Sequence, residues 1–508
     1  MTTARERLGL TTGALIAILA FALMGVWSPR LADRPSEFAR AGLAPTGADT
    51  QPALDANEEQ NEQTEGVEQR VQAWEAALKA GTAGQGGKRT FLTGAAAPAA
   101  TGWVGEVPID TSVDDWEPAI AADPHSSYVY LLTTRYGTDK PCKGDCPSPW
   151  ISLSISANNG VTWSTAKPLC ACQGRGQFDP IIEVVPNTGD VYSLFMIGFN
   201  VWFQKSNDHG AHWSAPVPVY GQVAWNDKPI IAVSDDGTDV YAAFNGPTGG
   251  DPWIAHSSDA GATWSQVKII DSGKYIYAFD GDVASDGTVY FAESSLQYQN
   301  AGKSGPLAPG VDEHVFISRD HGLTWIDKVV ASSQPGEACV AIGCKPDFYT
   351  GHAAISADSR GNLVFLYDAS TTFLGLQRIY ASRSTNQGRS WSTPVAISAA
   401  GEESTDPMIE STGNGDVRIA YAQTSSGGDV DAWNQWFRSS KDGGATWSTP
   451  IRISDAISGA VYKTAAGYAE VYGDYGEMAI TSAGKTIATW GEGISYTGPG
   501  GVWVNREK

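Results

Sequence analysis

The stretches that decide the fold are eight-residue segments such as SNDHGAHW at residues 206–213, in which serine, aspartate, glycine and tryptophan keep a fixed spacing. This S-x-D-x-G-x-T-W pattern recurs, with Asn for Asp in some copies, at residues 156–163, 206–213, 257–264, 318–325, 384–391 and 440–447. The Asp or Asn side chain folds back on the backbone and the glycine accepts a positive φ, so each copy predicts a hairpin turn. The tryptophan then begins the next strand.

Each motif lies inside a longer unit of four short strands. In the second unit the strands are PIIEVV (180–185), VYSLF (191–195), VWFQK (201–205) and SAPVPVY (214–220). The pattern of the first strand recurs seven times, beginning at Glu117, Asp179, Lys228, Asp280, His352, Asp406 and Glu477. Repeated four-stranded units pack radially, so the sequence predicts an all-β, seven-bladed β-propeller.

The seventh unit supplies only three strands before the chain ends. Residues 103–110 (WVGEVPID) match the strands that follow the motifs, such as WSTPIRIS from Trp447. We therefore expect this N-terminal strand to complete the last blade and to close the ring, which removes an exposed sheet edge.

The chain divides into three segments of different composition. Arg5 and Arg7 precede an uncharged stretch at residues 8–27, so residues 1–34 are expected to be a signal peptide or a membrane anchor, and the pattern does not separate the two. Residues 35–100 are rich in Ala, Gly, Glu, Gln and Pro and predict a flexible, disordered linker with a short helix at 67–78. Residues 101–508 form the propeller, which we expect to be a monomeric head located outside the cytoplasm.

The amino-acid composition limits which kinds of partner and which covalent links are expected. The chain has 34 Lys and Arg against 56 Asp and Glu, a net charge of −22, which argues against a nucleic-acid partner. In an exported protein the six cysteines predict disulfides. We expect Cys142 and Cys146 to bridge to Cys170 and Cys172, and Cys339 to pair locally with Cys344. A zinc site in CKGDC and CAC is the alternative.

The strand order places the long connections on one face of the predicted ring of blades and the motif turns on the opposite face. The connections at residues 135–150, 294–312, 331–351 and 455–475 are expected to be loops on the functional side. The motif side is expected to be structural.

The mouth of the central channel on the loop side gathers acids and aromatic residues. Sugar rings stack on aromatic faces, and paired carboxylates can cleave glycosidic bonds as acid and base or nucleophile. The candidate catalytic residues are Tyr475, Glu477, Asp406, Asp179, Asp280 and His352. The candidate substrate-binding residues are Glu117, Lys228, Trp116, Phe178, Trp225, Phe279, Tyr349, Arg135 and Arg175.

The alternative interpretation of these acids is structural, because a carboxylate just before an inner strand can cap backbone amides around the channel. The spacing D-x-D-x-D-G of a calcium loop is missing, so we expect no cofactor, although the acid ring leaves calcium open.

The repeated motif resembles the Asp-box, or BNR repeat, of the sialidase-like β-propellers, over roughly residues 101–508. In sialidases three arginines bind the substrate carboxylate, a Tyr backed by a Glu is the nucleophile, and an Asp handles the proton. Tyr475 and Glu477 match the nucleophile pair by type. The chain departs from the family in its seven blades and in lacking an Arg-Ile-Pro element before the first motif. Arg135 and Arg175 alone are placed near the loop side, so the resemblance does not imply a typical sialidase.

Together these features predict an exported glycan-active protein, a glycoside hydrolase or polysaccharide lyase that acts at the channel mouth. One alternative is a non-catalytic propeller that binds a carbohydrate or a protein. A second is an assembly scaffold tethered to the membrane through residues 8–27.

Overall fold

The computed structural model describes residues 97–508 except 111, 137–140, 145, 171–173, 224, 247–249, 271–273, 301–303, 337–349, 425–432, 456–462, 465–466, 472–474 and 494–499. The expected signal or anchor at 1–34, and almost all of the linker, lie outside the described residues. Within the described residues, no helix is long and apolar enough to cross a membrane.

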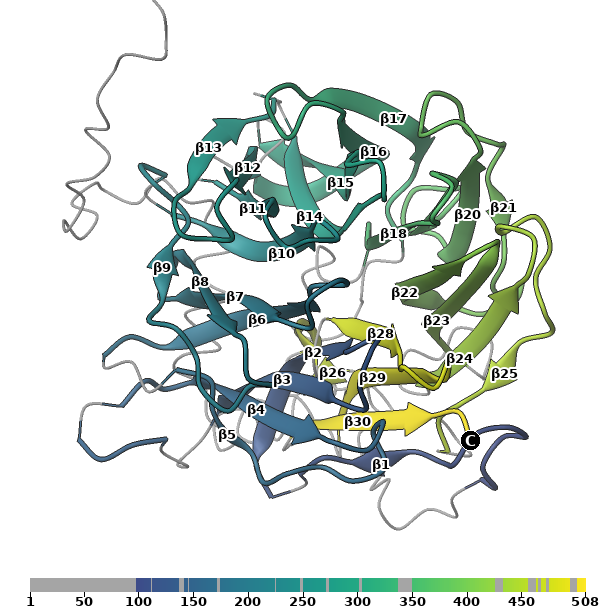
Figure 1. The fold of residues 1–508 in the computed structure, drawn as a ribbon. Helices are drawn as coiled ribbons and strands as arrows, with labels where there is room; N and C mark the ends of the chain where they lie inside the picture. The colour runs from purple at the N-terminus through teal and green to yellow at the C-terminus, as the bar shows by residue number, and fades with distance from the viewer. Residues whose placement is uncertain are drawn as a thin grey trace, which may run out of the picture. The chain divides into compact units, whose positions relative to one another are not determined.

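The described chain folds into seven four-stranded antiparallel sheets, the blades, arranged in a ring (Figure 1). Blade 1 is β2 (Asp114–Ala122), β3 (Val129–Tyr136), β4 (Trp150–Ser156) and β5 (Lys167–Pro168). Blade 2 is β6 (Gln177–Val184), β7 (Val191–Ile197), β8 (Val201–Ser206) and β9 (Val217–Pro218). Blade 3 is β10 (Asp227–Val233), β11 (Val240–Asn245), β12 (Pro252–Ser257) and β13 (Ser265–Lys268).

Blade 4 is β14 (Tyr275–Val283), β15 (Val289–Asn300), β16 (Ser304–Ser318) and β17 (Ile326–Ser333). Blade 5 is β18 (Ala353–Ala357), β19 (Leu363–Ala369), β20 (Arg378–Ser384) and β21 (Val395–Ala396). Blade 6 is β22 (Ser404–Gly413), β23 (Asp416–Thr424), β24 (Trp433–Ser440) and β25 (Ile451–Arg452). The all-β, seven-bladed fold class is thus confirmed.

Blade 7 combines the two ends of the described chain. Its strands are β28 (Gly476–Ile480), β29 (Thr486–Gly493), β30 (Gly500–Arg506) and β1 (Val107–Pro108). In β1, Val107 lies opposite Val504 and Pro108 opposite Trp503. A separate hairpin of β26 (Lys463–Thr464) and β27 (Gly467–Val471) precedes β28.

The recurring motif forms the turn between the third and fourth strands of blades 1 to 6. In the second copy, Ser206 Oγ accepts from Gly210 N at 2.9 Å, and Asp208 Oδ1 accepts from His212 N at 2.8 Å. His209 and Gly210 both adopt positive φ, 56° and 75°. The turn therefore needs two left-handed residues in succession, whereas the pattern pointed only to the glycine.

The motif tryptophans pack between blades. Trp264 of blade 3 meets Phe203 of blade 2 with ring centroids 5.5 Å apart, and Trp325 of blade 4 meets Tyr241 of blade 3 at 6.4 Å. Each such contact buries a large aromatic surface against the preceding sheet, so the turns hold the ring together.

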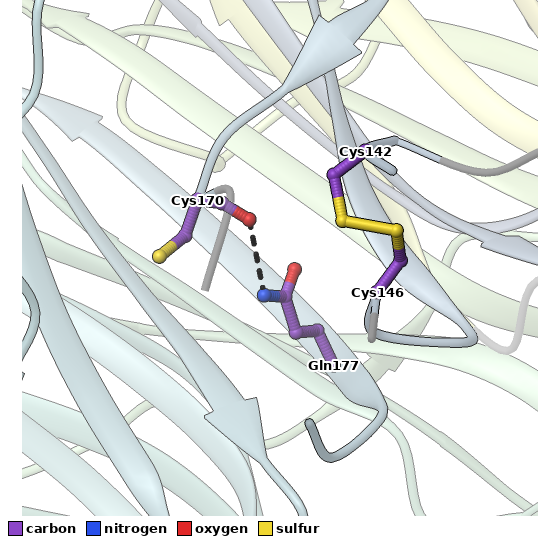
Figure 2. Close-up of a disulfide and its surroundings, with 4 residues drawn as sticks. All are labelled: Cys142, Cys146, Cys170 and Gln177. Carbon is purple, nitrogen blue, oxygen red and sulfur yellow. Dashed lines mark hydrogen bonds between the residues drawn. A yellow bond between two sulfur atoms is a disulfide. The ribbon is translucent and has the colours of Figure 1, made fainter. Parts of the chain in front are cut away.

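Two expectations about the connections are corrected. Residues 294–312 are not simply a loop, because β15 and β16 extend through most of this segment. Cys142 pairs with Cys146 across four residues rather than with the neighbouring connection (Figure 2).

Cys170 is also disulfide-bonded, and its carbonyl accepts from Gln177 Nε2 at 3.2 Å. Cys172, Cys339 and Cys344 lie outside the described residues, so their expected pairings stay predictions.

Candidate functional site

Five innermost strands carry a β-bulge or register shift near their start, and in four of them a candidate residue with positive φ lies within the bulge. These residues are Glu117, Asp179, Lys228 and Asp406, with φ of 53°, 47°, 50° and 55°. Each precedes a proline. A positive φ is costly for a residue other than glycine, and such strain is found where a side chain must be aimed. Two of the four residues, Asp179 and Asp406, line the central cavity, whereas Glu117 is buried and accepts hydrogen bonds from Thr134 and Asp179.

The remaining three blades place their polar residues differently. His352 follows Gly351, and it sits just before β18. Asp280 lies opposite Ala292, and Glu477 opposite Thr489. In blade 2 the position that corresponds to Asp280 and Glu477 is held by Ile181, which lies opposite Leu194. Ile181 comes two residues after Asp179 along the strand. The expectation of seven equivalent positions is therefore wrong for Asp280 and Glu477, which lie one step deeper.

A cavity of about 520 Å³ occupies the channel. Its lining includes the candidate residues Asp179, Phe279, Asp280, His352, Asp406, Tyr475 and Glu477. The structure thus brings all six candidate catalytic residues to one cavity, although at two depths.

Lys228 and Tyr475 meet at this cavity. Lys228 Nζ donates to the Tyr475 hydroxyl at 3.0 Å and lies 5.0 Å from the centre of its ring. Lys228 belongs to blade 3 and Tyr475 immediately precedes blade 7, and these blades are not neighbours in the ring. The contact therefore joins two separated sectors of the channel, and the ammonium group favours the ionised form of the phenol.

Several of the acids also cap the neighbouring blade. Glu117 Oε2 accepts from Asp179 N at 2.9 Å, and Asp280 Oδ2 accepts from Ile355 N at 2.8 Å. Glu477 Oε2 accepts from Ile120 N. In each case the donor is on the innermost strand of the next blade, where one edge is not paired within its own sheet. These three carboxylates therefore cap backbone amides of the adjacent blade, and two of them, Asp280 and Glu477, also line the cavity.

A further set of acids lies deeper and was missed by the sequence reasoning. These acids hold equivalent positions on the innermost strands of blades 2, 4 and 6. Their cross-strand partners show this: Glu183 lies opposite Tyr192, Asp282 opposite Tyr290 and Glu410 opposite Arg418. The available signal was a second acid in DPIIE, DGD and DPMIE, two or four residues after the first.

Burial changes the protonation of the channel acids. It raises the pKa of Glu183 and Asp280 to about 8 and that of Asp282 to about 6. Burial, together with the other acids, also raises the pKa of Glu410 and Glu477 well above the usual range. A carboxyl group with a pKa of about 8, such as that of Glu183 or Asp280, holds its proton at neutral pH and can donate it.

His352 is held by a residue that the sequence reasoning did not identify. Its Nδ1 lies 3.0 Å from Asp368 Oδ2 and 3.1 Å from Thr405 Oγ1. Its ring packs edge-on against Phe279, with centroids 5.0 Å apart. Asp368 is the sixth residue of β19, and only the pairing of β18 with β19 brings it to His352, so no local sequence pattern marks it.

The expected aromatic platform is smaller than predicted. Phe279 and Tyr475 line the cavity, but Trp116, Phe178 and Trp225 are almost completely buried in the protein. A buried ring cannot stack on a sugar, so these three residues serve packing instead. Tyr349 lies outside the described residues.

The two arginines that were expected to bind substrate have different environments. Arg135 is buried and forms two hydrogen bonds with Asp115, from Nε at 2.7 Å and from Nη2 at 2.8 Å. This ion pair occupies the guanidinium group, which corrects the expectation that Arg135 binds substrate. Arg175 is exposed.

Blade 4 contains an arrangement that resembles a nucleophilic triad by residue type. Ser295 Oγ lies 3.1 Å from His314 Nε2, and His314 Nδ1 lies 2.7 Å from Asp327 Oδ1. Ser295 is only 1% exposed, and the three residues sit on the adjacent strands β15, β16 and β17. A nucleophile must reach its substrate, so this line is a cross-strand network that satisfies buried polar groups.

Among the described residues, no group of three or more His, Cys, Asp or Glu side chains converges well enough to hold a metal ion. The zinc alternative for Cys142 and Cys146 conflicts with their disulfide.

Comparison with known proteins gives similar structures at low identity. A protein of unknown function from Dyadobacter fermentans is 12% identical with a TM-score of 0.46, over 80% of this chain and 98% of that chain. An ulvan lyase, a polysaccharide lyase, is 10% identical with a TM-score of 0.48, over 78% and 95%. An intramolecular trans-sialidase from Ruminococcus gnavus is 12% identical with a TM-score of 0.41, over 81% and 98%.

Likeness at this level concerns the fold and assigns no activity. No model of a known protein family matches the chain, and no curated protein sequence matches it. The chain has the fold of a seven-bladed β-propeller, and the turns between the third and fourth strands of six blades resemble Asp-box turns.

Proposed function

We propose that this protein is an exported glycan-active enzyme that cleaves glycosidic bonds at the channel mouth. The observation that carries the proposal is the 3.0 Å contact between Lys228 Nζ and the Tyr475 hydroxyl beside a cavity lined with acids. A phenol next to an ammonium group ionises more readily, and it can then act as nucleophile or base.

The second requirement of glycoside cleavage is a proton donor for the leaving group. Glu477 lines the same cavity two residues from Tyr475, and burial raises its pKa well above the usual range, which favours the protonated form that a proton donor needs. Tyr475 and Glu477 together supply the two roles, with Lys228 rather than a second carboxylate activating the tyrosine.

Export is part of the same proposal. The charged start and apolar run at residues 1–34 are typical of a secretion signal or an anchor. The disulfide between Cys142 and Cys146 is characteristic of an oxidising compartment, which supports this location.

The test is a screen of neutral and acidic oligosaccharides with the full-length protein, in which products are identified by mass spectrometry. We expect cleavage, and a loss of at least about 100-fold in kcat for Tyr475→Phe. Tyr128→Phe is the matched control, because Tyr128 stacks on His209 of an Asp-box turn and should leave kcat unchanged.

Three outcomes separate the alternatives. New reducing ends without unsaturation indicate hydrolysis, whereas an unsaturated product indicates elimination by a lyase. Binding without cleavage by the wild-type protein would overturn the enzymatic proposal in favour of a non-catalytic binding propeller.

A further inference from the structure

We infer that Asp368 is a positioning residue that makes His352 the base of the channel cavity. The inference rests on the proposed function, because it assigns a role within the same site. It is carried by the hydrogen bonds that converge on Asp368 from two segments of the chain, residues 351–352 and Thr405.

Asp368 is completely buried and receives four donors. Its Oδ1 accepts from Gly351 N at 2.6 Å and from His352 N at 3.0 Å. Its Oδ2 accepts from Thr405 Oγ1 at 2.8 Å and faces His352 Nδ1 at 3.0 Å. One carboxylate oxygen therefore fixes the backbone that carries His352, and the other fixes the imidazole ring.

This arrangement selects one tautomer. An ionised carboxylate only accepts hydrogen bonds, so His352 Nδ1 must carry the proton that it donates to Asp368. Proton exchange with a ligand in the cavity then falls to Nε2. The edge-on contact with Phe279 restricts rotation of the ring, so its orientation is set from both sides.

The charge of Asp368 also lowers the cost of protonating His352. An imidazolium ion in a buried site is unfavourable alone, but beside Asp368 it forms a pair without net charge. In the reaction, the Tyr475 oxygen forms a bond to the sugar carbon, the bond from that carbon to the leaving oxygen breaks, and the leaving oxygen takes the proton of Glu477. A water O–H proton then moves to His352 Nε2, and the electron pair of that bond forms the new bond from the water oxygen to the sugar carbon while the bond from that carbon to Tyr475 breaks. The proton on His352 returns to Glu477, which restores the starting state.

Other charged groups face this part of the cavity. They are Asp280 on β14, Asp406 on β22, Glu477 on β28 and Tyr475 just before β28, and Lys228 on β10 contacts Tyr475. Glu313 on β16 interacts electrostatically with Asp368. These groups are common to the wild-type protein and the variants, so they do not account for a difference between them.

The test is an NMR titration of the His352 ring in the full-length, isotope-labelled protein, with the resonance assigned from His352→Gln. In Asp368→Asn we expect the titration midpoint to fall by at least about one pH unit, because an adjacent negative charge is lost. The acid limb of the pH–rate profile should move in the same direction. Asp358→Asn is the matched control, since Asp358 is a buried aspartate at the other end of blade 5 and should leave the midpoint in place.

If Asp368→Asn does not fold, Thr405→Val tests the same inference. It removes one donor to Asp368 Oδ2, so the carboxylate interacts more strongly with His352 and the midpoint should rise. Lower stability with an unmoved midpoint would show that Asp368 only supports the backbone, and would overturn the inference. The titration needs no turnover, so it can succeed even if no glycan is cleaved.

Discussion

At the scale of single residues, the Asp-box turns depend on backbone conformations that few side chains tolerate. The fifth position of each turn is a glycine with φ between 74° and 80°. The fourth position is also left-handed, yet it holds Asn159, His209, Ala260, His321 or Gln387 in five of the six copies. The two positions differ in the space around them, and this difference can be tested.

We expect Gly261→Ala to destabilise the protein by at least about 2 kcal/mol, because it adds left-handed strain and overpacks the site. Gly261 has a φ of 80°, and a Cβ there would overlap the ring of Phe203 in the preceding blade. The measurement is the urea midpoint of the full-length protein. Gly443→Ala is the control, since Gly443 also has positive φ but a Cβ there meets nothing within 4 Å. Its cost should be about 1 kcal/mol, and equal costs for the two variants would contradict a steric origin.

At the scale of elements, the carboxylates at the channel mouth act between strands. The innermost strand of a blade has one edge outside its own sheet, and a buried N–H group on this edge needs an acceptor. Glu117 of blade 1 provides such an acceptor for Asp179 N on the innermost strand of blade 2. The same carboxylate also accepts a hydrogen bond from Thr134 Oγ1.

This role predicts different effects for two substitutions of Glu117. Glu117→Ala leaves two buried donors without this acceptor and should cost about 1–3 kcal/mol of unfolding free energy. Glu117→Gln retains a carbonyl oxygen at the same place and should cost less than about 1 kcal/mol. Urea unfolding of both variants measures the difference. A glutamine variant as unstable as the alanine variant would mean that the charge, and not the hydrogen bond, is required.

The elements also show what sequence can and cannot predict here. Seven sheets and six turns were predictable because each depends on a local pattern, such as the serine, aspartate and glycine at residues 206–210. The depth of Asp280 and Glu477 was not, because register shifts near the start of five innermost strands change which residues lie opposite each other without changing the spacing in the sequence. Asp368 was hidden for another reason, since strand pairing alone brings it to His352. The pairing of Cys142 with Cys146 depends on loop geometry, which spacing does not determine.

At the scale of the whole molecule, the ring gathers negative charge at its centre. Seven innermost strands surround one channel, so acids from blades that are remote in sequence become electrostatic neighbours. Glu410 of blade 6 interacts with Glu183 of blade 2 and Asp282 of blade 4 in this way. No single blade shows this effect.

This convergence predicts that stability falls as pH rises across the neutral range. A carboxyl group whose pKa is higher in the folded state binds more protons folded than unfolded between the two values. For Glu183 these values are 4.5 and about 8, so its contribution to stability declines from pH 4.5 to pH 8. Glu183→Gln cannot ionise. It should therefore raise the free energy of unfolding relative to wild type by at least about 1 kcal/mol more at pH 8 than at pH 5.

Asp442 of the sixth Asp-box turn provides the matched control. Its carboxylate accepts from Thr446 N, which lowers its pKa to about 2, so its stabilising contribution is lost only as pH falls from 3.8 toward 2. Between pH 5 and pH 8, Asp442→Asn should change stability by a constant amount, whatever its size. Differential scanning calorimetry of the three proteins at both pH values measures the contrast. If Glu183→Gln also shifts the unfolding temperature equally at pH 5 and pH 8, Glu183 is ionised in the folded protein, and the channel must hold a compensating positive charge.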